Sequence, residues 1–180
     1  MTSDFYQIIR KRQSDRSFDP DKEVESEKIQ RIIEAAHIAP SACNSQPWHF
    51  IVVDEAEKCR MVSEALASMG MNKFAAEAPV HIIIVEETPN FSARLGGWIK
   101  NKHFPHIDCG IAAAHITLAA TAEGLGSCIL GWFDEKKIKK ILNIPSGKRV
   151  LMDIIIGYST QPYMDKTRKP VNEIMSKNKY

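Results

Sequence analysis

The sequence has little net charge and no long apolar run. Its 24 Lys and Arg residues nearly balance 22 Asp and Glu residues, which leaves a formal charge of +2 at pH 7. A charge this small gives no reason to expect nucleic acid or an anionic membrane as the main partner. No segment approaches the roughly 20 consecutive apolar residues that cross a bilayer, and the first residues do not read as a signal peptide. We therefore expect neither a nucleic-acid partner nor a membrane partner.

Cysteine is scarce and scattered. The four cysteines form no Cys-x-x-Cys pair: Cys43, Cys59, Cys109 and Cys128. Free thiols in a reducing cytoplasm are the expectation, so we predict a cytoplasmic protein. With 180 residues, of which 44% are hydrophobic and 26% charged, the chain has a globular composition and is long enough to bury a core. We expect one domain over residues 1–180, without repeats or low-complexity tracts.

Apolar periodicity predicts both helices and strands. Helices are expected at 5–9, 26–39, 55–69 and 107–126 and after Asp134, with Ser26 and Asp134 as caps. Strands are expected at 48–54, 80–87, 127–133 and 149–158. The second strand, VHIIIVEE, is so apolar that both of its faces should be covered. This order favours an α+β or three-layer fold around one mostly buried sheet.

Two segments are harder to assign. Residues 87–106 contain Pro89, Gly96, Gly97 and Pro105, so we expect a loop or lid with at most one helical turn. Residues 159–180 form a polar tail with few apolar anchors. Such a tail frays in solution unless something holds it, and a partner subunit is one candidate.

Two basic clusters are candidates for binding an anion. The stretch KRQSDR has the spacing Arg-x-Ser-x-Arg at Arg12, Ser14 and Arg16, and the tail carries Lys166 and Arg168. A phosphate monoester needs two or more cations together with hydroxyl or amide donors. The alternative is ordinary: basic residues near the end of a helix interact favourably with its dipole, and most charge runs are solvated faces.

The loop APSACNSQPWHF at 39–50 has no charge before His49 but is rich in hydroxyl and amide groups. Helix termination and a turn explain Pro40 and Asn44. They leave Ser41, Ser45 and Gln46 unexplained. Amide side chains donate and accept hydrogen bonds at once, which suits the polar edge of a flavin or a nucleobase. Nucleophilic catalysis by a serine or cysteine of this loop is a third interpretation, but it lacks an identified base.

The stretch HFPHIDC offers His103, His106, Asp108 and Cys109 as metal ligands. Pro105 and a helix starting at Asp108 give a geometry that is unconvincing for zinc. We interpret Asp108 as a helix cap and the two histidines as part of a surface or pocket edge. The prediction is that no metal binds.

Taken together, several motifs resemble those of the FMN-dependent nitroreductase family, in order and over nearly the whole chain. They are KRQSDRSF, APSACNSQPWHFIVV, EGLGSCILGWF, IIIGY and DKTRKP. The resemblance implies a central, mostly antiparallel sheet flanked by helices. It also implies a homodimer in which the C-terminal tail extends onto the partner subunit and two FMN sites lie across the interface.

The resemblance also assigns candidate FMN-binding residues, position by position. Arg12 and Ser14 would hold the phosphate or ribityl chain, and Arg16 would lie nearer the pyrimidine side. The loop at 40–46 would come from the other subunit, and Leu130 and Gly131 would approach the central ring. The complete predicted set is Arg12, Gln13, Ser14, Arg16, Pro40, Ser41, Ala42, Asn44, Gln46, Asn72, Leu130, Gly131, Lys166 and Arg168.

The implied chemistry is the reduction of nitroaromatics, quinones or related conjugated acceptors by NADH or NADPH in a ping-pong cycle. FMN carries the electrons, so we predict no catalytic side chain. This sequence departs from the family pattern at Gln13, where many members have arginine or histidine, and it is shorter around the lid. The alternatives are a dehalogenase, an enoate reductase or a flavin-degrading enzyme on the same scaffold, or an anion- or nucleotide-binding protein without turnover.

Overall fold

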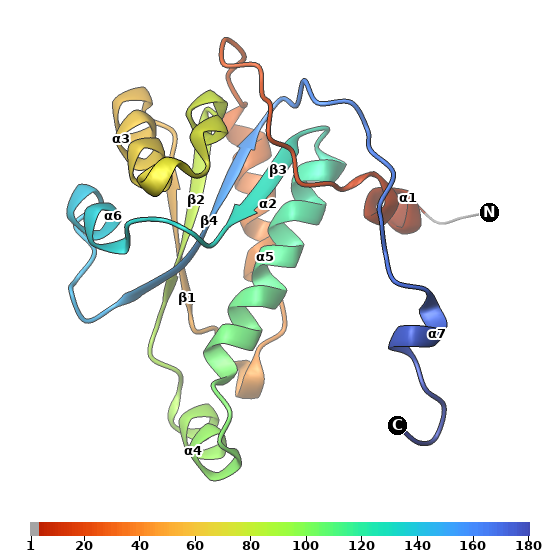
Figure 1. Ribbon diagram of the computed structural model, residues 1–180. Helices are drawn as coiled ribbons and strands as arrows, with labels where there is room; N and C mark the ends of the chain where they lie inside the picture. Colours follow the sequence, from red (N-terminus) through yellow and green to blue (C-terminus); the bar gives the residue numbers. More distant parts are fainter. Residues whose placement is uncertain (1–3) are drawn as a thin grey trace.

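The structure is a computed structural model that describes residues 4–180. Its frame is an antiparallel sheet with the strand order β1-β2-β4-β3, and helices lie on both faces (Figure 1). The strands are β1 Trp48–Val53, β2 Val80–Glu86, β3 Gly126–Leu130 and β4 Arg149–Gly157. The predicted α+β class, the antiparallel sheet and the three layers are confirmed.

Each face of the sheet has its own apolar core. Helices α3 (Ala56–Leu66) and α6 (Glu135–Ile141) pack on one face, and α2 (Ser26–His37) and α5 (Phe104–Ala122) pack on the other. Alternate residues of β2 enter the two cores, so all of its residues from Val80 to Val85 are buried. The expectation that both faces of this strand are covered is confirmed.

The expected loop at 87–106 is instead largely helical, and the prediction was wrong. Helix α4 spans Phe91–Lys100, and the Asn90 side chain caps it by accepting a hydrogen bond from the Ala93 nitrogen at 2.9 Å. Glycine costs about 1 kcal/mol in a helix relative to alanine. Here a Cβ on Gly97 would lie 2.6 Å from the Lys102 carbonyl oxygen. Glycine at position 97 therefore allows the chain to pass close to α4 before α5 begins. Local helix propensity does not reveal this contact.

The two predicted caps have different outcomes. Asp134 caps α6, since its side chain accepts a hydrogen bond from the Lys137 nitrogen at 3.0 Å. Ser26 is the first residue of α2 rather than its cap, and the capping position is Glu25, which makes no side-chain capping bond. The prediction for Ser26 was therefore wrong by one residue, a usual error where a helix frays.

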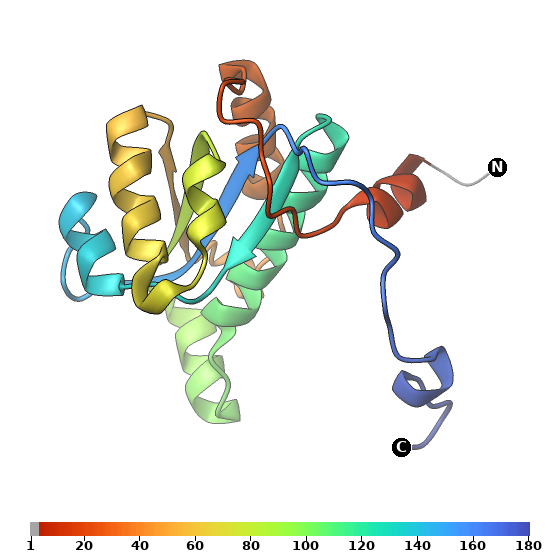
Figure 2. The same ribbon diagram turned by 45° about the horizontal axis from the view of Figure 1, so that its top comes forward.

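Both ends of the described chain project from the layered body (Figures 1 and 2). Helix α1, Asp4–Lys11, buries none of its residues, and the tail ends in the short helix α7, Val171–Ile174. Residues 171–180 are all exposed. No helix within residues 4–180 combines the length and apolarity that crossing a membrane requires.

Candidate functional site

The first basic motif runs in extended conformation beside β3. Ser14 forms a bridge with Ser127, and the Asp15 nitrogen donates to the Ser127 carbonyl oxygen at 2.9 Å. Successive side chains of an extended segment point in opposite directions. Burial raises the pKa of the Cys128 thiol, while Arg16 and Arg12 act on it in the opposite direction. The bridge and the hydrogen bond hold the motif directly against β3.

Asp15, which the sequence did not single out, joins the basic motif to β3 and to the tail. It is 5% exposed, and its carboxylate accepts hydrogen bonds from the Ser127 nitrogen at 3.1 Å and the Ser159 hydroxyl at 2.7 Å. The amide of Gln13 donates to the same carboxylate at 3.0 Å. A short acidic residue inside a basic run was the available signal, since a charge mismatch of this kind indicates a structural contact.

The tail returns along the basic motif and brings one of its two predicted cations there. Lys166 Nζ donates to the Arg10 carbonyl oxygen. Gln13 accepts from the Met164 nitrogen at 3.1 Å and donates to the Pro162 carbonyl oxygen at 3.2 Å. The amide of Gln13 is thus engaged on both sides by the tail and Asp15, while its contact with FMN stays a prediction.

Arg168 is not joined to the basic motif in the single chain. Its guanidinium donates to the carbonyl oxygen of its own neighbour Thr167 at 2.7 Å. The side chain is exposed on a segment that leaves the body (Figure 2). Its proposed role therefore requires the tail to be fixed by another surface.

The end of β3 forms an open surface next to the basic motif. Leu130 is buried, whereas Gly131 is exposed and a Cβ added there would meet no atom within 4 Å. Asn72, just before η3 (Lys73–Glu77), donates its side-chain amide to the Trp132 carbonyl oxygen at 2.9 Å. In addition, the Arg16 guanidinium lies 6.0 Å from the centre of the Phe74 ring. The structure thus brings the basic motif, the β3 end and Asn72 around one surface.

The uncharged loop at 40–46 lies elsewhere. It contains the short helix η1 (Ala42–Asn44) and leads into β1, whereas the basic motif borders β3 at the opposite edge of the sheet. The Asp108 carboxylate accepts from the Ala42 nitrogen at 3.1 and 3.2 Å, and Asn90 donates its side-chain amide to the Cys43 carbonyl oxygen at 2.9 Å. The prediction of Asp108 as a helix cap was wrong, because α5 begins earlier, at Phe104, and the carboxylate instead fixes this loop.

Within the loop, the polar side chains hold the backbone in a defined shape. The Ser41 hydroxyl accepts from the Gln46 nitrogen at 2.9 Å, and the Gln46 amide donates to the Asn44 side chain at 3.1 Å. Cys43, Asn44 and Gln46 have φ values of 52°, 50° and 47°. Left-handed conformations cost energy for residues other than glycine and gather at functional sites. The loop is therefore a preformed surface, which is consistent with a binding role.

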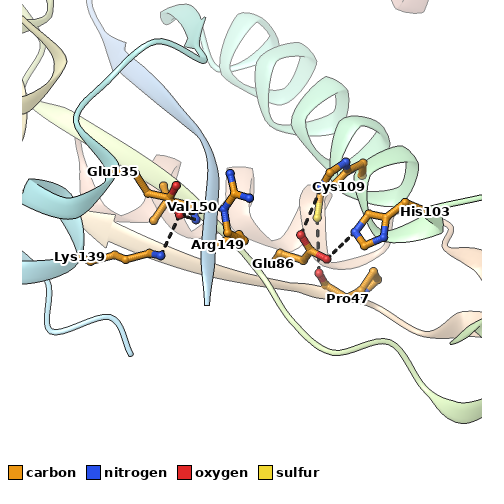
Figure 3. A network of polar contacts seen from close by, with 9 residues as sticks. Pro47, Glu86, His103, Cys109, Glu135, Lys139, Arg149 and Val150 are labelled. Carbon is orange, nitrogen blue, oxygen red and sulfur yellow. Dashed lines mark hydrogen bonds and ion pairs between the residues drawn. The ribbon is translucent and has the colours of Figure 1, made fainter. Parts of the chain in front are cut away.

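A second polar cluster lies beside this loop, where the end of β2 pairs with the start of β1 (Figure 3). The Glu86 carboxylate contacts His103 Nε2 at 2.6 Å and His106 Nε2 at 3.2 Å. The Cys109 thiol donates to the Pro47 carbonyl oxygen at 3.4 Å, and burial raises its pKa to about 12. The four residues of HFPHIDC that were considered as metal ligands therefore do not form one site. Asp108 binds the loop at Ala42 and Cys109 binds Pro47 after it, whereas the two histidines contact Glu86.

A buried Ser63–His81–Asp153 chain has the atom order of a hydrolytic triad but not its accessibility. His81 lies 3.2 Å from the Ser63 hydroxyl through Nε2 and 2.7 Å from Asp153 Oδ2 through Nδ1. All three side chains are buried, and the Ser63 hydroxyl donates to the Ala75 carbonyl oxygen in η3 at 3.1 Å. A nucleophile must reach a substrate, so this chain is a support that ties η3 to α3 and the sheet.

Comparisons with known proteins all indicate the same family. The "Nitroreductase family" model matches residues 9–77 and 60–158. An oxygen-insensitive NADPH nitroreductase of Helicobacter acinonychis is 26% identical over 206 residues, covering 94% of each chain. Iodotyrosine deiodinase 1 of Sus scrofa is 28% identical over 200 residues, covering 97% of this chain and 68% of the other.

Solved structures share the fold as well. An FMN-dependent nitroreductase from Clostridium difficile R20291 superposes with a TM-score of 0.74 at 31% identity, covering 96% of this chain and 98% of the other. The family model spans most of the sequence, and the structural match extends over almost all of it. The chain belongs to the nitroreductase family.

Proposed function

We propose that this member of the nitroreductase family is an FMN-dependent oxidoreductase. It takes electrons from NADH or NADPH and passes them to nitroaromatics, quinones or related conjugated acceptors. The observation that carries the proposal is the surface beside β3, where Ser14 and Arg16 of the basic motif lie near the open backbone at Gly131 and the Asn72 amide. Family membership and an FMN-dependent structural relative support it.

The residues of this surface fit a flavin mononucleotide. Arg12, Ser14 and Lys166 supply the cationic and hydroxyl groups that a phosphate monoester needs. Gly131 presents backbone without a side chain and with no atom within 4 Å of a Cβ position, so a flat ring can approach it. Arg168 would complete the phosphate site once the tail is fixed.

A second copy of this chain completes the proposed site. The loop at 40–46 is uncharged and preformed, yet in one chain it lies at the opposite sheet edge from the basic motif. The tail extends away from its own body and its last ten residues are all exposed (Figure 2). A homodimer in which each loop covers the partner's flavin and each tail wraps the partner explains both features.

When bound, FMN supplies hydride acceptance and electron donation, so no side chain needs to act as a nucleophile or general base. The protein binds and orients the reactants. Arg16 places a positive charge near the proposed pyrimidine side, which favours ligand states that carry more negative charge. We propose a ping-pong order, in which NAD(P)H gives up its hydride and leaves before the acceptor enters the same space.

Flavin binding tests the assignment of the phosphate site. Arg12→Ala should weaken FMN binding by about tenfold or more, since a hydrogen bond to a charged group contributes about 1.5–3 kcal/mol. Riboflavin, which lacks the phosphate, should lose little affinity. Arg60→Ala, a change of an exposed arginine on α3, is the matched control. Equal losses for FMN and riboflavin would contradict the phosphate role, and failure of the native protein to bind FMN would reject the function.

A halogenated compound is the specific alternative to a nitroaromatic or quinone as the electron acceptor. The deiodinase relative covers almost the whole chain at 28% identity, which is comparable to the nitroreductase relative. A reductive dehalogenase on the same scaffold is therefore the second candidate. Anaerobic turnover of a halogenated phenol compared with a nitroaromatic, using the same reduced protein, distinguishes the two.

A further inference from the structure

Glu86, His103 and His106 form a compact cluster outside the predicted FMN-binding residues, next to the segment that joins the loop at 40–46 to β1. Glu86 ends β2, and the two histidines lie at the start of α5, His103 immediately before its first residue. The three potential ligand atoms all lie within 4.8 Å of one another. We propose that these residues bind a divalent transition-metal ion, with Zn²⁺ as the expected type.

The present distances are close to those of a metal site. Zn–N and Zn–O bonds near 2.0–2.2 Å place tetrahedral ligand atoms about 3.3 Å apart. His106 Nε2 is 3.2 Å from Glu86 Oε2, which already matches this separation. His103 Nε2 is 2.6 Å from Oε1, so it must move outward by about 0.7 Å to reach it. The side chains of His103 and His106 are 56% and 59% exposed, so they are free to make this adjustment.

The charge around Glu86 favours a cation. Its side chain is only 15% exposed, and among residues 4–180 its ion-pair partners are the two histidines. Arg149, its neighbour on β4, directs its Nε to Glu135 at 3.1 Å instead. Lys148 pairs with the adjacent Glu87. A largely buried carboxylate without a lysine or arginine partner is stabilised by a bound cation.

The two histidine rings lie edge to face with their centres 4.2 Å apart, and each presents its Nε2 to Glu86. A neutral imidazole that now donates from Nε2 can carry its proton on Nδ1 instead, which leaves the Nε2 lone pair for a metal. No redox change or external reactant is required.

Three protein ligands leave a coordination position for water or an exogenous group. His103 also lines a hollow of about 460 Å³ between α4 and the start of α5, together with Arg94, Trp98 and Lys102. The two basic side chains of this hollow favour an anionic fourth ligand, such as a carboxylate. The bound metal would link the end of β2 to the turn between α4 and α5. It would thereby restrict the motion of α4.

The test uses tag-free, full-length protein freed of metal by a chelator, with ZnCl₂ and CoCl₂ as probes. Calorimetry should give one Zn²⁺ per chain, and Zn²⁺ should raise the melting temperature. His106→Gln and Glu86→Gln should each weaken Zn²⁺ binding at least tenfold and remove the temperature shift. Co²⁺ should give the visible absorption of a site of low coordination number.

Two controls separate this site from general surface binding. His37→Gln changes an exposed histidine on α2, and Glu87→Gln changes the neighbouring carboxylate, so both should leave Zn²⁺ affinity within twofold. Circular dichroism checks that all variants are folded. Absence of stoichiometric Zn²⁺ binding to the native protein would overturn the proposal. Binding that His106→Gln and Glu86→Gln leave unchanged would also overturn it, because the metal would then lie elsewhere.

Discussion

The carboxylate of Asp15 accepts a hydrogen bond from the backbone nitrogen of Ser127 at 3.1 Å. Together with the bridge between Ser14 and Ser127, this contact fixes the basic motif beside β3. The same carboxylate accepts from the Ser159 hydroxyl, so it also fixes the start of the tail. One buried acid therefore organises the two segments that supply the proposed phosphate site.

The close approach of Asp15 to β3 requires glycine at position 126. A Cβ on Gly126 would lie 2.7 Å from the Ser159 Cβ and 2.9 Å from the Asp15 Cγ. We predict that Gly126→Ala lowers the free energy of unfolding by about 1–3 kcal/mol, measured by urea denaturation, and weakens FMN binding. Gly147→Ala is the control, since its Cβ would meet nothing within 4 Å. Equal stability of the two variants would argue against the Asp15 contact.

The Asp108 carboxylate holds the loop at 40–46 through the Ala42 nitrogen. Asp108 is 3% exposed, so Asp108→Ala leaves that nitrogen without its charged acceptor, at a cost of about 1.5–3 kcal/mol. We predict that bound FMN dissociates faster from this variant, as followed by flavin fluorescence. Asp108→Asn keeps one acceptor oxygen and should show a smaller effect. If Asp108→Ala released FMN at the native rate, the loop would not cover the flavin.

Removal of residues 160–180 tests the role of the tail. These residues make their polar contacts with residues 10–17 of their own chain and leave the final segment exposed. We predict that the truncated chain forms monomers or aggregates in size-exclusion chromatography with light scattering. A flavin-loaded dimer of unchanged size would show that the tail does not hold the partner.

Buried thiols make stability depend on alkaline pH. Burial is the main cause that raises the pKa of Cys109 to about 12 and of Cys59 to about 11, from an ordinary value of 9.0. Above about pH 9 the unfolded chain releases protons that the folded chain keeps, so the free energy of unfolding falls as the pH rises towards 11. Each thiol contributes up to about 1.4 kcal/mol per pH unit. Urea denaturation between about pH 8 and about pH 10.5 should show a flatter decline for Cys109→Ala. Cys43→Ala, a change of an exposed thiol, should keep the native slope.

The layers of this fold were predictable because apolar periodicity reports burial directly. The run from Val80 to Val85 is buried on both faces, as its continuous apolar character predicted. Helix α4 was not predictable in the same way. Its two glycines lower helix propensity, whereas its stability rests on the Asn90 cap and the contact of Gly97 with Lys102, which only the folded chain reveals.

The sequence indicated that Arg12, Ser14 and Arg16 lie near one another, because they belong to one short segment, which lies beside β3. Their contact with FMN stays a prediction. The sequence could not reveal that Asp15 contacts Ser127 or that Gln13 contacts Met164, because these partners lie more than a hundred residues away. Glu86 was missed as a partner of His103 because helix α4, which brings the two residues together, was not expected.

The most direct test of the proposed function is the anaerobic addition of NADH or NADPH to the FMN-loaded protein, followed by visible absorption. The account predicts that the flavin band bleaches with one equivalent of donor per flavin, and that a nitroaromatic or quinone added afterwards restores it. A band that persists with either donor, in protein that has bound FMN, would contradict the account.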